Sequence, residues 1–195
     1  MPIVKPNAED ASFDELATAI GMVAMKSAQC DDYLRDIIVD ITNTDFDLWF
    51  LFEGQSTEWL MSTLKTSLEF IDPFYNDWPK ELHDELIQSV NALKRPRDLR
   101  NWVIHGTWMR PFRVEETHPR PWGEIDSDEP WFCLRSRSRQ PFGTVPMKFT
   151  ASDVRVLSEK IDEVSVDMMK AYAKMVKHRY AGEFEKSRWS YWLNE

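Results

Sequence analysis

Residues 150–180, TASDVRVLSEKIDEVSVDMMKAYAKMVKHRY, are the stretch that decides the fold. From Val154 to Met175, apolar side chains recur every three or four residues, which is the spacing of one face of an α-helix. Thr150 and Asp153 precede this pattern in the arrangement of a capping box, with Asp in place of the commoner Glu or Gln. The sequence therefore predicts a long last helix that runs to about Tyr180.

The same periodicity predicts helical segments earlier in the chain. The first spans about 12–42, with Ser12 as its expected N-cap. The second starts at Ser56 or Thr57 and stops at Asp72-Pro73.

A third helical segment starts at Trp78-Pro79. Pro96 should kink or restart this helix, because proline lacks an N–H and its ring clashes with the preceding turn. Gly106 follows the last periodic residues and is typical of a helix C-terminus. Several long amphipathic helices in one chain indicate a helical bundle.

Residues 107–150 differ from the rest of the chain. The segments 108–114 and 131–139 are rich in aromatic and alternating residues, and 145–149 resembles a third strand. We expect a small β-hairpin or meander here, inserted before the last helix. The predicted fold is mainly α, a four- to five-helix bundle with this insertion, in a single domain covering 1–195.

The composition limits the function classes. The chain has 195 residues, the size of one domain, and a net charge of −9, which argues against a general nucleic-acid binder. Cys30 and Cys133 are too few for a disulfide framework or a thiolate zinc site. We expect no membrane span and no signal peptide, and hence a cytoplasmic protein. Phosphate-binding glycine loops, zinc spacings and nucleophile elbows are absent from the sequence, so we expect no cofactor and no metal.

The charge is unevenly distributed. Residues 94–113 contain six basic side chains and one acid, Asp98, which gives this window a charge of +5 and the rest of the chain −14. A positive region on an acidic protein is where an anionic ligand is expected to bind.

The most informative residues lie inside this window. Arg100 and His105 are separated by four residues at a helix end, Asn101 follows the Arg, and Gly106 follows the His. This pattern resembles the R-x4-6-H motif of the HEPN superfamily, and the order of predicted helices is also similar to HEPN. The resemblance implies a four- or five-helix bundle with the motif late in its third long helix.

The resemblance implies a metal-independent endoribonuclease, in the manner of toxins or phage-defence effectors. His105 would move protons, Arg100 would stabilise phosphate charge, and Asn101 would orient His105 or the scissile phosphate. Residues five apart lie about 140° from each other on a helix, so the two motif side chains flank a face instead of sharing one line. A two-fold homodimer would supply two His and two Arg to one cleft, as the resemblance also implies, and we expect the monomer to be inactive.

RNA is the expected substrate. Lys94, Arg95, Arg97 and Arg110 are expected to steer phosphates toward the motif. An RNA groove in the β insertion is a further hypothesis, built on two sets of residues. They are Trp108, Trp122 and Trp131 for base stacking, and Arg135, Arg137 and Arg139 for a basic strand face.

An antitoxin or regulatory protein is a further expected partner. In HEPN toxins that a nucleotidyltransferase partner modifies, a Tyr often stands two residues after the His. Thr107 occupies that position here, so the resemblance does not extend to this kind of neutralisation.

Alternatives remain open at this point. A non-catalytic HEPN-like dimer would bind RNA, nucleotide or a protein partner through the same cleft. In a plain helical interaction protein, the Arg, Asn and His would have ordinary structural roles, the arginines of 135–139 would form a solvated face, and the tryptophans would pack in the core.

Overall fold

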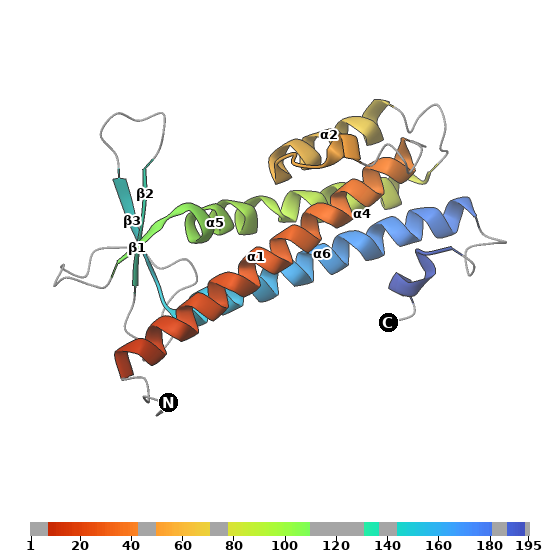
Figure 1. The fold of residues 1–195 in the computed structure, drawn as a ribbon. Helices are drawn as coiled ribbons and strands as arrows, with labels where there is room; N and C mark the ends of the chain where they lie inside the picture. The colour runs from red at the N-terminus through yellow and green to blue at the C-terminus, as the bar shows by residue number, and fades with distance from the viewer. Residues whose placement is uncertain are drawn as a thin grey trace. The chain divides into compact units, whose positions relative to one another are not determined.

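The computed structural model describes residues 8–42, 50–70, 78–109, 131–136, 144–180 and 187–193 (Figure 1). The structure is mainly helical with a small antiparallel sheet, which confirms the predicted fold class. The chain forms two compact units. Unit 1 comprises 1–27 and 96–160, and unit 2 comprises 28–95 and 161–195. The single domain over 1–195 remains a prediction.

The helices of unit 1 are the N-terminal part of α1 (Ala8–Ile41), most of α5 (Lys94–His105) and the start of α6 (Ala151–Arg179). Their apolar faces are buried, as the predicted periodicity requires. Because α1 begins at Ala8, the prediction of Ser12 as its N-cap is wrong.

The predicted meander is present in unit 1. Strands β1 (Thr107–Met109), β2 (Trp131–Ser136) and β3 (Thr144–Phe149) pair antiparallel in the order β1-β2-β3. The second strand ends at Ser136, before the predicted boundary at 139, and residues 110–130 and 137–143 lie outside the described part of the chain.

Aromatic contacts hold the sheet within unit 1. The rings of Trp131 and Phe13 are 6.0 Å apart, which joins β2 to α1. The rings of Trp108 and Phe149 are 5.6 Å apart and join β1 to β3. Phe149 is fully buried and Trp131 nearly so. The sheet therefore shares the core of the helices in this unit.

The capping box predicted at the start of the last helix is confirmed. The Thr150 N–H donates to Asp153 Oδ2 at 2.7 Å, and the Asp153 N–H donates to Thr150 Oγ1 at 2.9 Å. Both residues are buried, so these two bonds satisfy backbone donors that water cannot reach. Helix α6 follows from Ala151 and ends at Arg179, next to the predicted end at Tyr180.

Unit 2 contains the rest of α1 and α6 together with α2 (Thr57–Phe70), α4 (Lys80–Ala92) and the short 3-10 helix η3 (Ser190–Leu193). Ser56 Oγ accepts the Trp59 N–H at 3.2 Å, which identifies Ser56 as the cap of α2. Leu93 separates α4 from α5, and Pro96 lies in the first turn of α5. The helix restarts at this point, since the first turn needs no N–H from proline.

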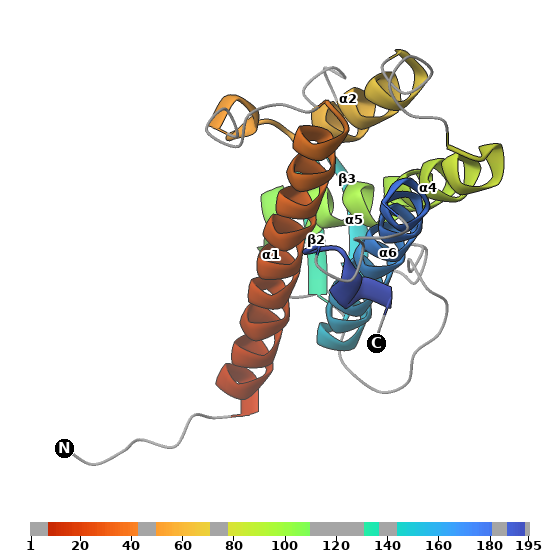
Figure 2. The same ribbon diagram turned by 90° about the vertical axis from the view of Figure 1, so that its right-hand side faces the viewer.

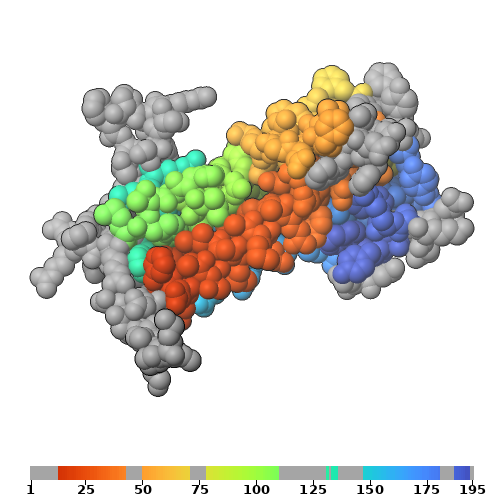
Figure 3. Space-filling view, viewed as in Figure 1, coloured from red at the N-terminus to blue at the C-terminus, as the bar shows by residue number. Residues whose placement is uncertain are grey.

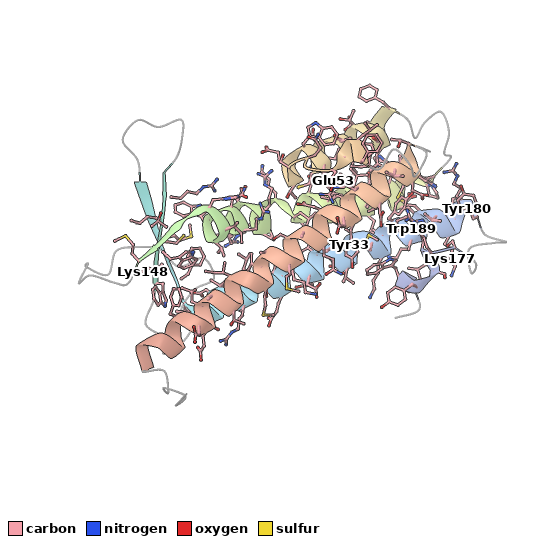
Figure 4. The ribbon with its side chains drawn as sticks, viewed as in Figure 1. Tyr33, Glu53, Lys148, Lys177, Tyr180 and Trp189 are labelled. Carbon is pink, nitrogen blue, oxygen red and sulfur yellow. The ribbon has the colours of Figure 1, made fainter. Side chains whose placement is uncertain are left out.

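The C-terminal segment of unit 2 attaches through Trp189 (Figure 4) and through Trp192, whose ring meets that of Tyr33 edge-on at 5.2 Å, and η3 lies beside α6 (Figures 1 and 2). The Trp189 ring meets the buried Tyr172 ring edge-on at 4.7 Å, and the Arg188 guanidinium lies over its other side at 4.5 Å. Arg188 also pairs with Asp36 at 3.6 Å, and the Tyr172 hydroxyl donates to Asp40. Burial, and next the negative charge of Asp40, raise the pKa of Tyr172, so this hydroxyl stays protonated.

Candidate active site at the end of helix α5

The three motif residues lie on α5, whose buried side includes Leu99, Trp102 and Val103. His105 is exposed in the last turn, while Arg100 and Asn101 are half-buried. Asn101 and His105 are four residues apart, about 40° around the helix, so they share one face. Arg100 lies about 140° from His105, on the flank of that face. The helix thus presents an imidazole and an amide together, with a guanidinium at their edge.

Arg100 has an incomplete set of hydrogen bonds. One of its terminal nitrogens, Nη1, donates to Asn101 Oδ1 at 3.1 Å. Its Nε atom is buried and has no hydrogen-bond partner in the described part of the chain. A buried charged donor without an acceptor is costly, and most such groups in folded proteins are satisfied. Because this Nε atom is buried, an anionic ligand would bind the terminal nitrogens of Arg100.

The sheet caps the end of the helix that carries His105. The Cys133 thiol donates to the Trp102 carbonyl at 3.1 Å, and Trp108 Nε1 donates to the Val103 carbonyl at 3.0 Å. Both carbonyls belong to the last turn of α5, and the Trp102 carbonyl also accepts the Gly106 N–H at 2.9 Å. The strands β1 and β2 therefore fix the turn from which the His105 side chain projects. Sequence analysis missed both roles, because Cys133 and Trp108 reach the helix only through the folded sheet.

Gly106 permits this close approach. A Cβ atom at position 106 would lie 2.6 Å from the Trp102 carbonyl oxygen and would also overlap the Cys133 sulfur. The glycine expected at the helix end is present, but its reason is lack of space and not a left-handed backbone, since Gly106 has no positive φ. Burial raises the pKa of the Cys133 thiol to about 11, so the sulfur remains a protonated donor.

The basic residues predicted to bind nucleic acid differ in burial, in ion pairing and in the unit to which they belong. Arg97 is half-buried and forms a 2.7 Å ion pair with the adjacent Asp98, which offsets its charge. Lys94 and Arg95 are exposed in the first turn of α5 and belong to unit 2, whereas the motif belongs to unit 1. Arg110 lies outside the described residues. The phosphate-steering role of these four residues remains a prediction.

The aromatic residues considered for base stacking serve packing where the structure describes them. Trp131 is 8 % exposed and Trp108 uses its indole N–H to cap α5. Trp131 therefore offers little ring surface to a base, whereas Trp108 is half-buried. Trp122, Arg137 and Arg139 lie outside the described residues, and Arg135 is half-buried in β2.

Unit 2 has a separate groove of about 450 Å³ between α4, α6 and η3. Glu85, Asp167, Lys170 and Lys174 contribute two negative and two positive side chains to its lining, and Glu85 pairs with Lys174. This balance gives no preference for an anion. Within the described ranges, no cluster of three His, Cys, Asp or Glu side chains is placed to hold a metal ion. No helix among the described residues is long and apolar enough to cross a membrane.

Comparisons of the chain with protein-family models, with curated proteins and with solved structures find no match. The chemistry of the α5 end therefore has to be judged from its own residues. It combines a proton-transfer group, a fixed cation and an amide, which together suit binding and reaction of a phosphate ester.

Proposed function

We propose that this protein is a metal-independent endoribonuclease that acts as a homodimer, with Arg100, Asn101 and His105 of each copy lining one cleft. The observation that carries the proposal is the unsatisfied Arg100 Nε beside Asn101, on the helix that also exposes His105. A phosphodiester would accept hydrogen bonds from the terminal nitrogens of this guanidinium. The HEPN resemblance of the motif supports the same assignment.

The reaction would use the RNA 2′-hydroxyl as nucleophile. One His105 takes the proton from this hydroxyl while its oxygen bonds to the adjacent phosphorus. The bond from phosphorus to the 5′ oxygen breaks, and the second copy's His105 gives that oxygen a proton. The products are a 2′,3′-cyclic phosphate and a free 5′-hydroxyl. Arg100 stabilises the negative charge on the phosphoryl oxygens during the displacement.

Asn101 is a positioning residue in this scheme. Its Oδ1 accepts the hydrogen bond from Arg100, which leaves the amide NH₂ group to donate. Because Asn101 and His105 share a helix face, that amide can donate to a phosphate placed next to the imidazole. Asn101 would thereby orient the Arg100 guanidinium relative to the scissile bond.

The test is cleavage of a mixed RNA pool in EDTA by the purified wild type and by His105→Ala. We expect the wild type to cleave and His105→Ala to lose activity by roughly 10²-fold or more. His178→Ala is the matched control, since His178 is also an exposed histidine in the last turn of a helix, α6. Cyclic phosphate and 5′-hydroxyl ends on the products would identify the 2′-hydroxyl mechanism.

Two results would contradict the proposal. One is equal cleavage by the wild type and His105→Ala. The other is a well-folded wild-type dimer that binds RNA without cleaving it, which would favour the non-catalytic dimer instead. If RNA cleavage is confirmed, growth arrest on expression in cells that His105→Ala relieves would support a toxin or phage-defence effector that acts in the cytoplasm.

A further inference from the structure

The segment 50–70 of unit 2 exposes several large apolar side chains to solvent. Four of them are between 41 % and 68 % exposed, namely Phe50, Leu51, Trp59 and Phe70. The segment lies at the surface of the molecule in Figure 3, where its atoms are orange to yellow. Single exposed apolar residues need no explanation, but a contiguous patch of them marks an interaction site.

On α2 the exposed residues form one row, which we call the α2 row. Around the helix, Thr63 and Phe70 lie about 40° and 20° to one side of Trp59. Thr66 lies about 20° to its other side. The buried residues of the helix are between about 80° and 200° away. The steps of four, three and four residues along the row are those of a seam between two packed helices.

The turn before α2 extends the row and is held in place. The Phe52 ring lies 6.2 Å from the Trp59 ring. Arg35 Nε of α1 donates to the Phe52 carbonyl at 3.1 Å, and the Glu53 N–H donates to the Phe50 carbonyl at 3.1 Å. These bonds fix the backbone that carries the exposed Phe50. A partner would therefore not have to order this part of the surface on binding.

The surroundings of the α2 row are acidic. Residues 45–77 contain seven acidic side chains and one basic one, which gives −6 of the −9 of the whole chain. Glu58 and Glu69 are exposed and lie about 80–100° to the same side of the row. The basic residue, Lys65, donates to Asn91 of α4. This acidic flank repels phosphate groups, so nucleic acid and anionic lipid do not suit the surface.

We propose that the α2 row binds an amphipathic helix of a partner protein, whose apolar stripe covers the row and whose Lys or Arg side chains face the acidic flank. Large apolar side chains of the partner pack over the two short Thr side chains, between the rings of Trp59 and Phe70. These rings are eleven residues apart, about 16 Å along the helix, so roughly three turns of the partner are in contact. The opposite charges select a basic helix over an acidic one.

The first experiment measures the binding of two designed helical peptides by fluorescence anisotropy. Both peptides have Leu at the a and d positions of a heptad, and one has Lys where the other has Glu at the flanking positions. We expect the Lys peptide to bind at least about tenfold more tightly. Trp59→Ser and Phe70→Ser should each weaken its binding by roughly tenfold or more. Met25→Ser removes an exposed apolar side chain of α1 and should have no effect.

Charge variants test the acidic flank separately. Glu58→Gln combined with Glu69→Gln should reduce the preference for the Lys peptide. Glu81→Gln combined with Glu159→Gln removes two exposed carboxylates from α4 and α6 and should not. Phe70→Ser should keep the melting temperature of the wild type, because the Phe70 side chain is largely exposed. A loss of peptide binding in this variant therefore reports the surface and not the fold.

A second experiment identifies the partner segment by photo-cross-linking in cells of the source organism. The photoreactive residue p-benzoylphenylalanine replaces Thr66, an exposed position between the two rings, and mass spectrometry determines the segment attached to it. We expect a segment of another protein with apolar residues every three or four positions and a net positive charge. The same replacement at Thr18, an exposed position on α1, is the control.

Three results would overturn the proposal. The first is equal binding of the Lys and Glu peptides by the wild type. The second is unchanged binding of the Lys peptide by both Trp59→Ser and Phe70→Ser. The third is cross-linking at position 66 that does not exceed the control, or that attaches nucleic acid, lipid, an acidic segment or a second copy of this chain. Ribonuclease activity enters none of these measurements, and the residues of the surface belong to unit 2, whereas the α5 motif belongs to unit 1.

Discussion

The end of α5 in unit 1 and the Tyr172 cluster in unit 2 are both polar groups set against a helical core, but their hydrogen bonding differs. In unit 2, Tyr172 donates to Asp40, and Arg188 pairs with Asp36 while covering the Trp189 ring. In unit 1, Arg100 keeps a buried Nε without a partner among the described residues, and His105 faces solvent.

The difference predicts which polar groups serve stability and which serve the proposed activity. A paired cluster recovers the cost of burying its polar atoms through its own bonds, so it can be maintained for stability alone. An unsatisfied buried cation lowers stability, and we expect Arg100 to be maintained for the proposed activity. The comparison therefore predicts that substitutions in the Tyr172 cluster change the free energy of unfolding. Substitution of Arg100 should mainly change activity.

The largest effect on stability is expected at Gly106, which leaves room for the sheet to contact the end of α5. Gly106→Ala should lower the free energy of unfolding by about 1–3 kcal/mol, because the new Cβ overlaps the Trp102 carbonyl and the Cys133 sulfur. Urea unfolding followed by circular dichroism measures it. Gly21→Ala is the control, since that site is open and the helix should gain about 0.5–1 kcal/mol. Equal effects of the two variants would refute the close approach at Gly106.

The second prediction compares the Tyr172 cluster with the end of α5 directly. Tyr172→Phe removes the donor to Asp40 and should cost about 1–2 kcal/mol, because it leaves a partly buried carboxylate unsatisfied. Arg100→Leu should change the free energy of unfolding by less than about 0.5 kcal/mol, since it removes an unsatisfied donor along with the bond to Asn101. The same variant should abolish RNA cleavage. Loss of stability in Arg100→Leu that matches Tyr172→Phe would mean that Arg100 is structural.

Features decided by neighbouring residues could be predicted from the sequence. The capping box at Thr150 and Asp153, the cap at Ser56 and the restart at Pro96 depend on bonds within a few positions of the chain. The mainly helical fold with a meander also followed from periodicity, because burial of one face imposes that pattern. The prediction of Ser12 as the N-cap was wrong, because α1 begins at Ala8.

Features of the candidate site that depend on distant residues could not be predicted. Cys133 lies 31 positions from the Trp102 carbonyl that it caps, and no local pattern marks such a pair. The sequence identified Arg100, Asn101 and His105 as a motif but gave no information on the unsatisfied Nε. The exposed α2 row was also missed, because periodicity shows which face a helix can bury and not which face remains uncovered.

The smallest effect on stability is expected at Asp36. There the pH dependence distinguishes the cost of burying the carboxylate from the gain of its pair with Arg188. Burial raises the pKa of this carboxyl above its usual value, and Asp32 and Asp40 add to the shift while Arg188 and Arg35 oppose it. Since the folded pKa is the higher one, the charged carboxylate disfavours folding at neutral pH, and protonation removes this cost as pH falls through the folded pKa. Asp36→Asn should therefore raise the melting temperature slightly at pH 7, with a gain that shrinks in acid. Glu69→Gln, an exposed site on α2, controls for the loss of one negative charge. A lower melting temperature for Asp36→Asn at pH 7 would show that the Arg188 pair outweighs burial, and that unit 2 depends on this pair to hold its C-terminal segment.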